Sequence, residues 1–321
     1  MGRYVAAESP AMDRLVDETI AGIGSEIEAL HIPKLRGVVL GGGYGRGEGG
    51  VARDAETGEE HLYNDLDFFA ITEDGVSSAD LTAVGAQLEP VSKRWTEKLG
   101  IDVDFTVRTP WRIRHDQERL MIQELLHGYF DVAGAKGEVL FAGVESRGPS
   151  AFPWMEAARL MMNRGAGLLL AHETSSSQPS APFILRNINK CILGVGDARL
   201  IAGKGYLWKV EERAAALKDE LYAKAMAWKF RPRPESVCDW ETARETWLTA
   251  FDEVMAAGAG TPECRRSIYS TVRWIVRRKS LGEIRTLGLN PVVRILRQIA
   301  VMVRERRPLS PALKKDWLIF N

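Results

Sequence analysis

Residues 38–48 read Val-Val-Leu-Gly-Gly-Gly-Tyr-Gly-Arg-Gly-Glu, an apolar run that passes directly into a glycine-rich turn. Residues 64–71 read Asn-Asp-Leu-Asp-Phe-Phe-Ala-Ile and place two aspartates inside a second apolar run. A third run, residues 101–107, reads Ile-Asp-Val-Asp-Phe-Thr-Val and carries two more. Short apolar runs bounded by turn residues are typical of strands. The three runs therefore predict neighbouring strands of a small α/β domain.

The aspartates of these runs predict a metal site. Alternate side chains of a strand share a face, so Asp65 and Asp67 point the same way. Two adjacent carboxylates repel each other unless a cation lies between them, and Mg²⁺ prefers oxygen ligands. We expect Asp65 and Asp67 to bind two Mg²⁺ ions, which Mn²⁺ can replace. Asp102 and Asp104 both qualify as a third acid. We favour Asp104, expected to be buried at mid-strand, as metal ligand and proton acceptor.

The glycine turn has a different task. Gly42 and Gly43 lack a Cβ, so their backbone N–H groups can approach phosphate oxygens closely. Arg46 either neutralises charge nearby or pairs with Glu48 or an aspartate. A Walker-type phosphate loop would need Gly-Lys-Ser/Thr, which the turn lacks, and the dinucleotide fingerprint is met only loosely. The turn therefore predicts phosphate binding of another kind.

With these motifs the chain resembles the DNA polymerase beta-like nucleotidyltransferase superfamily over residues 36–108. Residues 44–48 are similar to the Arg-Ala-Arg-Gly-Glu of small bacterial members. The residues that match the family's glycine pair and three acids are Gly42, Gly43, Asp65, Asp67 and Asp104. The resemblance implies Mg²⁺-dependent transfer of a nucleoside monophosphate from an NTP to a hydroxyl or phosphate acceptor, with release of pyrophosphate. Two departures are Gly43, where many members have Ser, and a longer gap before Asp65, which suggests an inserted loop at residues 50–62.

Strand signals become rare beyond about residue 111, and helical periodicity takes over. We expect an α+β fold, with a small mixed-sheet nucleotidyltransferase domain in residues 1–145 and an all-α domain in residues 146–321. The expected strands are 37–41, 65–72 and 101–108, and residues 50–61 are expected to form a loop. The expected helices are 10–31, 78–99, 113–128, 153–173, 185–203, 208–228, 240–257, 262–280 and 290–306.

The resemblance also implies that the helical domain supplies a basic residue to the triphosphate. Lys190 is the best candidate. It lies four residues after Arg186, so the two side chains share one helix face. The alternative is that both are ordinary surface charges.

Charge gives an indication of the acceptor. The chain holds 43 basic and 43 acidic residues, yet residues 262–321 contain 14 basic and only 4 acidic ones. This basic end slightly favours an RNA acceptor over a small molecule or a nucleotide. An RNA-facing surface or an ordinary amphipathic helix is predicted from Tyr269, Arg273, Trp274, Arg277, Arg278 and Lys279.

Composition narrows the class further. The three cysteines are far apart and form no Cys-x-x-Cys pair, which argues against zinc and disulfide frameworks and favours a reducing, cytoplasmic location. We expect neither a signal peptide nor a membrane span, since no apolar run reaches about 18 residues. The alternative function is a catalytically inactive nucleotide-binding or scaffold protein that keeps the same fold.

Overall fold

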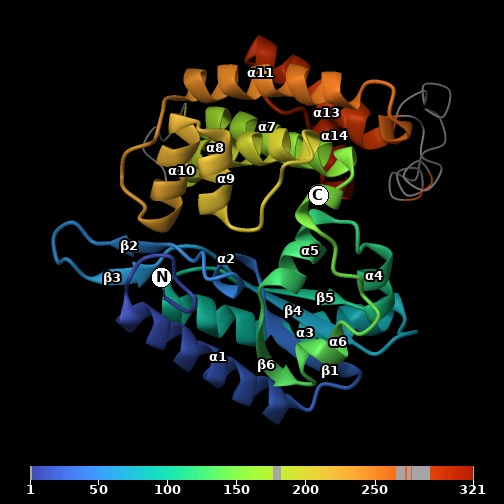
Figure 1. Cartoon of the computed structure of the whole chain (residues 1–321). Coiled ribbons are helices and arrows are strands. Elements are labelled where there is room, and N and C mark those ends of the chain that lie inside the picture. Colours follow the sequence, from blue (N-terminus) through green and yellow to red (C-terminus); the bar gives the residue numbers. More distant parts are fainter. Residues whose placement is uncertain (1, 176–181, 265–271, 273–275, 277–289, 321) are drawn as a thin grey trace. The chain divides into compact units, whose positions relative to one another are not determined.

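The structure is a computed structural model that describes residues 2–175, 182–264, 272, 276 and 290–320 (Figure 1). It is a mixed α+β fold, largely helical with one small mixed sheet, which confirms the coarse fold class. The chain divides into two compact units. The first holds the chain up to Arg147 together with Lys229–Pro232, and the second holds Gly148–Trp228 and the chain from Arg233 onward. The return of Lys229–Pro232 to the first unit was not foreseen from the sequence.

A four-stranded mixed sheet forms the centre of the first unit, with the strand order β5-β4-β1-β6. Its strands are β1 (Leu35–Leu40), β4 (Leu66–Thr72), β5 (Val103–Arg108) and β6 (Phe130–Gly134). Strand β4 pairs in parallel with β5, and β1 pairs antiparallel with β4 and β6. Parallel neighbours need a crossover connection, which α3 (Ser78–Leu99) provides between β4 and β5.

Helices cover both faces of this sheet (Figure 1). One core packs against α1 (Pro10–Leu30) and α3, and the other against α4 (Pro110–His115), α5 (Leu120–His127) and α6 (Gly137–Leu140). Because side chains alternate along a strand, Phe68 belongs to the first core and Phe69 to the second. Strand β4 is therefore buried on both faces over most of its length.

Local signals set the ends of the long helices. Ser9 caps α1 by accepting from the amide of Met12, and Ser77 forms a capping box with Asp80 at the start of α3. Gly100 ends α3 in the left-handed conformation, with φ of 70°. These signals lie within a few residues of each helix end, so the predictions for 10–31 and 78–99 agree closely with the structure.

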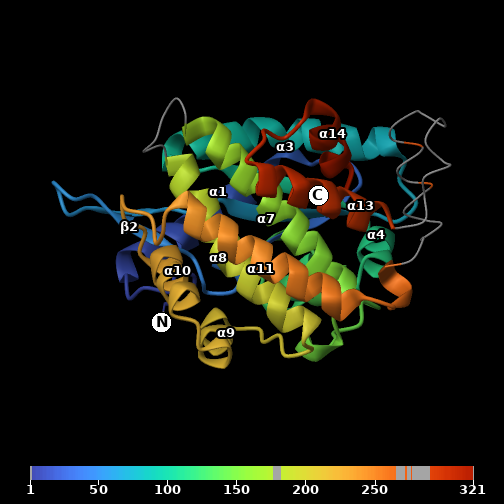
Figure 2. The ribbon, with the colours of Figure 1, turned by 90° about the horizontal axis from the view of Figure 1, so that it is seen from above.

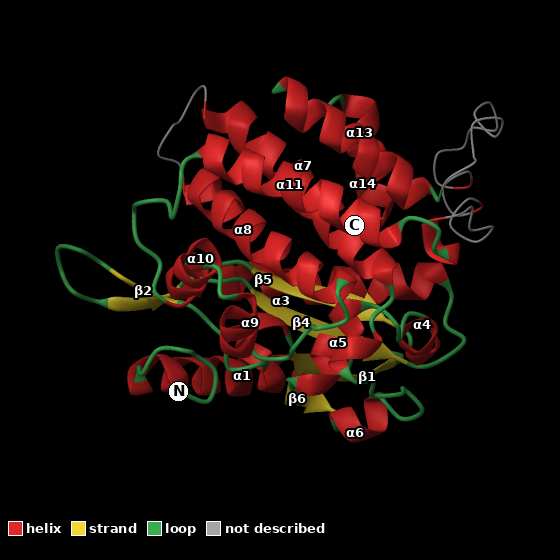
Figure 3. Cartoon of the chain, turned by 45° about the horizontal axis from the view of Figure 1, so that its top comes forward, coloured by secondary structure: helices red, strands yellow, loops and turns green. Residues whose placement is uncertain are grey.

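Two predictions for the first unit are wrong in detail, and two elements were not predicted. Residues 50–61 are not a loop: β2 (Val51–Arg53) and β3 (Glu60–Leu62) form an antiparallel hairpin. The expected helix 113–128 is instead the two helices α4 and α5, because the chain turns where the Arg119 amide donates to the Asp116 carbonyl oxygen. The structure also contains β6 and the short helix α2 (Gly42–Gly45), neither of which was predicted. Figure 3 shows the described strands within the first unit.

Every element described in the second unit is helical. These elements are α7 (Trp154–Ser175), α8 (Pro182–Ala202), α9 (Val210–Leu217), α10 (Glu220–Phe230), α11 (Trp240–Gly258), α13 (Pro291–Glu305), α14 (Pro311–Phe320) and the short turns Pro149–Ala151 and Pro262–Cys264. Helix α7 packs along α8, and both contact α11 (Figure 2). The predicted helix 208–228 is broken into α9 and α10 because Lys218 adopts the left-handed conformation. The last residues of α10 belong to the first unit.

Tryptophans anchor the second unit where glycines admit them. Trp247 is fully buried, and its indole N–H donates to the Met161 carbonyl oxygen at 3.1 Å. A Cβ at Gly165 would lie 2.5 Å from the Trp247 ring, so only glycine allows α7 and α11 to approach this closely.

Within the described ranges, no helix combines the length and apolar composition that a membrane span requires. The candidate RNA-facing residues between 269 and 279 lie outside the described residues.

Candidate active site

Two aspartates lie opposite each other across the parallel strands. Asp67 is the second residue of β4 and Asp104 the second of β5, and the pairing register joins them directly. Residues in register on neighbouring parallel strands point to the same face, with the strands about 5 Å apart. Their predecessors, Leu66 and Val103, are fully buried on the other face. The two acidic side chains therefore lie side by side on one face, and both are exposed.

Asp65 adds a third acid at the same end of the sheet. It directly precedes β4 and is half-buried. Although the Asp104 side chain is exposed, desolvation by the surrounding protein atoms is the largest cause that raises its pKa above the ordinary aspartate value, and the charges of Asp102 and Asp65 raise it further. Of the two candidates for the third acid, the register puts Asp104 beside Asp67. The expectation that Asp104 is buried at mid-strand is wrong, because β5 begins only at Val103 and leaves the residue exposed.

The glycine turn lies against these acids. It forms the short helix α2 directly after β1. At Gly42, φ is +62° and a Cβ would lie 2.2 Å from Oδ2 of Asp67. At Gly43, the closest non-neighbouring atom to such a Cβ is the Glu48 carbonyl oxygen, at 3.7 Å. The left-handed backbone and the close carboxylate therefore favour glycine at position 42, whereas a Cβ at position 43 would make only ordinary van der Waals contact.

Backbone hydrogen bonds fix the turn to the acidic strand. The Gly41 amide donates to the Asp67 carbonyl oxygen at 2.8 Å, and the Gly45 amide donates to the Gly41 carbonyl oxygen at 2.8 Å. The first N–H groups of a helix have no intrahelical acceptor. The amides of Gly42 and Gly43 are thus donors suited to an oxyanion at the end of the sheet that carries the acids.

Tyr44 and Asn64 hold the turn and the acidic strand in register. The buried Tyr44 hydroxyl donates to the Gly50 carbonyl oxygen at 2.9 Å and accepts from the Tyr63 amide at 3.2 Å. Burial raises the pKa of Tyr44, so the phenol stays protonated. The Asn64 side-chain oxygen accepts from the Gly50 amide at 2.7 Å. Sequence reasoning missed both roles, although both residues stand inside the quoted motifs.

Arg46 lies between two carboxylates. Its guanidinium is 3.5 Å from Glu48 and 3.3 Å from Glu124, and its side chain is largely buried. Of the roles considered for Arg46, the structure thus contains the pairing with Glu48. Glu48 also accepts from the Lys229 ammonium at 2.6 Å. Neither Glu124 nor Lys229 was a candidate from the sequence.

Lys190 belongs to the second unit. It is half-buried on α8, and Arg186, one turn before it, is half-buried as well. The first unit brings together the other predicted site residues, which are Gly42, Gly43, Arg46, Asp65, Asp67 and Asp104.

The donor chemistry of the acidic end fits Mg²⁺. All three aspartates offer carboxylate oxygens, the ligands that this ion prefers. Desolvation is the first cause of the raised pKa of Asp104, and the charges of Asp102 and Asp65 add to it; a bound cation would relieve this second, like-charge contribution. The described residues contain no group of three or more His, Cys, Asp or Glu already arranged as a metal site.

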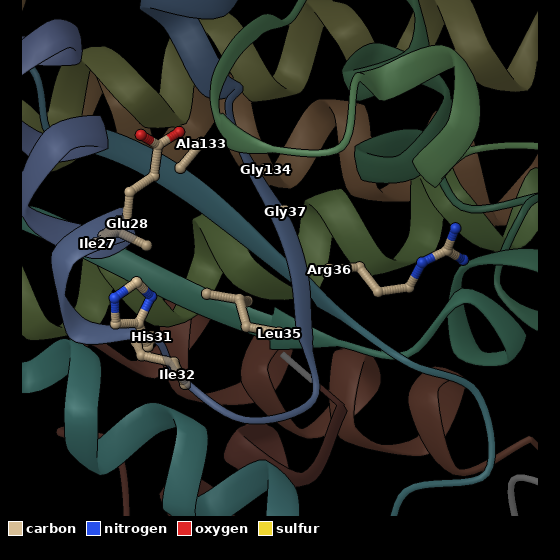
Figure 4. A pocket seen from close by; sticks show the side chains of 9 residues that line it. All are labelled: Ile27, Glu28, His31, Ile32, Leu35, Arg36, Gly37, Ala133 and Gly134. Atoms are coloured by element: carbon tan, nitrogen blue, oxygen red, sulfur yellow. The ribbon is translucent and has the colours of Figure 1, made fainter.

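A shallow pocket of about 140 Å³ lies elsewhere in the first unit (Figure 4). It is lined by Ile27, Glu28, His31, Ile32, Leu35, Arg36, Gly37, Ala133 and Gly134. These residues come from the end of α1, the start of β1 and the end of β6, whereas the glycine turn follows the other end of β1. The pocket is also small beside the roughly 300–1,000 Å³ typical of ligand sites. It is therefore separate from the acidic end of the sheet.

No family model matches this chain, and no curated protein matches it.

Proposed function

We propose that this protein is a Mg²⁺-dependent nucleotidyltransferase. It moves a nucleoside monophosphate from an NTP to a hydroxyl or phosphate acceptor and releases pyrophosphate. One arrangement carries the proposal: Asp67 and Asp104 are in register on parallel strands, and a Cβ at Gly42 of the adjoining turn would lie only 2.2 Å from Oδ2 of Asp67. A polar sheet rim without such a function would not require a left-handed glycine against one of its carboxylates.

In this proposal Asp65, Asp67 and Asp104 hold Mg²⁺, or Mn²⁺ in its place. When bound, the ions stabilise the charge on the phosphate, attacking and leaving oxygens of an in-line displacement. The carboxylates supply the negative charge that retains the ions next to the phosphates. Because Gly42 has no side chain, the Asp67 carboxylate can keep its position; a Cβ at residue 42 would lie 2.2 Å from Oδ2 of Asp67 and would displace it.

The chain's own groups orient the donor and move one proton. The amides of Gly42 and Gly43 donate to phosphate oxygens, which can approach closely because neither residue has a Cβ. For a hydroxyl acceptor, the oxygen attacks the α-phosphorus as its proton passes to a carboxylate oxygen of Asp104. The bond from the α-phosphorus to the bridging oxygen breaks, and pyrophosphate leaves with that electron pair. The raised pKa of Asp104 suits a proton acceptor.

Lys190 remains our candidate for a second-unit contact to the triphosphate. A positive charge there complements the phosphates, since charge-assisted hydrogen bonds are stronger than neutral ones. The acceptor is RNA, a small molecule or a nucleotide. The basic composition of residues 262–321 supports RNA slightly. Strong tRNA binding that weakens steeply with salt would favour RNA.

A second candidate is a non-catalytic nucleotide-binding or scaffold protein of the same fold. Mg²⁺-dependent NTP turnover distinguishes the two candidates.

The test is incubation of the purified protein with each α-³²P-labelled NTP and Mg²⁺, alone and with total RNA or a metabolite extract. The control is the Asp65→Ala/Asp67→Ala protein. A labelled product that the control lacks supports nucleotidyl transfer and identifies the acceptor class. Full activity in the control would refute the assignment. Nucleotide binding without any product would favour the non-catalytic candidate.

A further inference from the structure

A chain of four alternating charges lies beneath the glycine turn. The Lys229 ammonium is 2.6 Å from Glu48, Arg46 is 3.5 Å from Glu48, and Arg46 is 3.3 Å from Glu124. All four side chains are at least four-fifths buried, and that of Glu48 is only 6% exposed. A buried carboxylate is costly unless it is paired, so Glu48 depends on its cationic partners.

Glu48 also closes the glycine turn, so its pairing with Lys229 and Arg46 affects the position of the turn. Its amide donates to the Gly43 carbonyl oxygen at 2.8 Å, and the Arg46 amide donates to the same oxygen at 3.2 Å. The side chain of Glu48 is therefore fixed to Lys229 while its backbone is fixed to Gly43. Any shift of the buried carboxylate moves the backbone that we assign to phosphate binding.

Lys229 reaches this position from a distant part of the sequence. It lies 181 residues after Glu48, in the segment Lys229–Pro232 that returns to the first unit. The same segment makes a second ion pair, between Arg231 and Glu60 on β3. Glu60 in turn accepts from the Ser9 hydroxyl. The Arg231 pair anchors the segment to the hairpin, whereas the Lys229 pair leads to the glycine turn.

We propose that Lys229 is a positioning residue for nucleotide binding, which acts on the glycine turn through the buried carboxylate of Glu48. Its effect on NTP binding rests on the proposed nucleotidyltransferase function. Its effect on the order of the turn does not. Because the two anchors of the segment are separate, they can be removed one at a time.

The test compares Lys229→Met with Lys229→Arg, which keeps the charge, and with the matched control Arg231→Met, which breaks only the hairpin pair. Hydrogen exchange of the peptide that covers residues 41–48 reports on the turn, and steady-state kinetics report KM for the Mg²⁺–NTP and kcat. We expect exchange in residues 41–48 and KM to rise about tenfold in Lys229→Met, with kcat within about threefold of wild type. In Lys229→Arg, the exchange of residues 41–48 and KM should both lie close to the wild-type values. Arg231→Met should change neither the exchange nor KM.

Two further proteins test the route through Glu48. Glu48→Gln alone should resemble Lys229→Met, and the Lys229→Met/Glu48→Gln protein should lose no more than either single variant, because both act on one pair. The double variant also removes both charges together, which avoids leaving a buried ion alone and protects against a simple folding failure.

Several results would overturn the proposal. Equal losses in Arg231→Met and Lys229→Met would mean that only anchoring of the segment matters. An additive loss of NTP affinity in the double variant would mean that Lys229 contacts the nucleotide itself. Unchanged exchange of residues 41–48 in Lys229→Met would exclude a positioning role. If the wild-type protein binds no NTP, the proposed function fails, yet the exchange data still decide whether Lys229 orders the turn.

Discussion

Gly42 and Asp67 are in such close approach that a Cβ at position 42 would lie 2.2 Å from Oδ2 of the aspartate. The glycine also has a φ of +62°, a conformation that other L-residues adopt only with strain. The turn and the acidic strand are thus matched to each other. We predict that Gly42→Ala abolishes NTP turnover, because the new methyl group displaces the Asp67 carboxylate.

A Gly→Ala substitution at another left-handed glycine distinguishes the effect of the collision with Asp67 from the effect of backbone strain. Gly75→Ala has a similar φ of +76° with nothing within 4 Å of the new Cβ. It should lose only about 1–2 kcal/mol of unfolding free energy and keep full turnover. Gly43→Ser, where the nearest atom is 3.7 Å away, should fold and remain active. Denaturant unfolding and turnover assays check all three, and an active Gly42→Ala protein would contradict the close-contact argument.

The register of β4 and β5 makes a prediction about the acids. We expect Asp67→Asn and Asp104→Asn each to reduce turnover more than about 100-fold, beyond the loss typical of an outer-shell partner. Asp102→Asn is the matched control, since Asp102 directly precedes β5. It should keep most activity because the register pairs Asp104, and not Asp102, with Asp67. If Asp102→Asn is the more damaging change, Asp102 is the third ligand.

Metal binding has its own readout. Mg²⁺ at about 100 times its Kd should add about 2.7 kcal/mol to the unfolding free energy of wild type for each ion that it binds. The Asp65→Ala/Asp67→Ala protein should gain nothing, and EDTA should abolish wild-type turnover. Denaturant titrations with and without Mg²⁺ measure this difference, and equal stabilisation of both proteins would place the ion elsewhere.

The sequence predicts those parts of the site whose physics is local. The alternation of polar and apolar residues over 65–68 predicts that Asp67 lies on the opposite face from its core-facing neighbours, and the caps Ser9 and Ser77 define helix starts within a few residues. The hairpin β2–β3 was not predicted, because each strand has only three residues and a polar stretch separates Val51 from Leu62.

The pairing of Arg46 with Glu48 was among the alternatives that the sequence offered, but the participation of Glu124 and Lys229 could not be predicted from any local pattern. Glu124 lies on a helix whose other side faces the core, and Lys229 lies 181 residues from its partner Glu48. A lysine in such a helix has the same sequence signature whether it is solvated or buried against a carboxylate. Only the tertiary structure distinguishes the two cases.

The capping box of α3 predicts an acid-dependent loss of stability. Lys34 is the first cause, and hydrogen bonds from Ser77 add to it, in lowering the pKa of Asp80 to about 2. A lowered folded-state pKa means that the stabilisation is complete above the ordinary value of about 3.9 and is lost as the pH falls through about 2. The stability advantage of wild type over Asp80→Asn should therefore shrink between those values. Urea unfolding of both proteins across this range is the check, and an advantage independent of pH would refute it.

Lys190 is our candidate for a contact to the triphosphate, because the resemblance implies a basic residue from the helical domain and a positive charge complements phosphate. We expect Lys190→Met to raise KM for the NTP about tenfold or more, as the loss of one charge-assisted hydrogen bond would, while kcat changes less. Lys224→Met is the matched control: Lys224 is an exposed lysine in the same unit, paired with Glu220 one turn away. Both variants should unfold at wild-type denaturant concentrations. Equal KM values in the two variants would assign Lys190 to the ordinary surface charges and leave phosphate recognition to the glycine turn and the acids of the first unit.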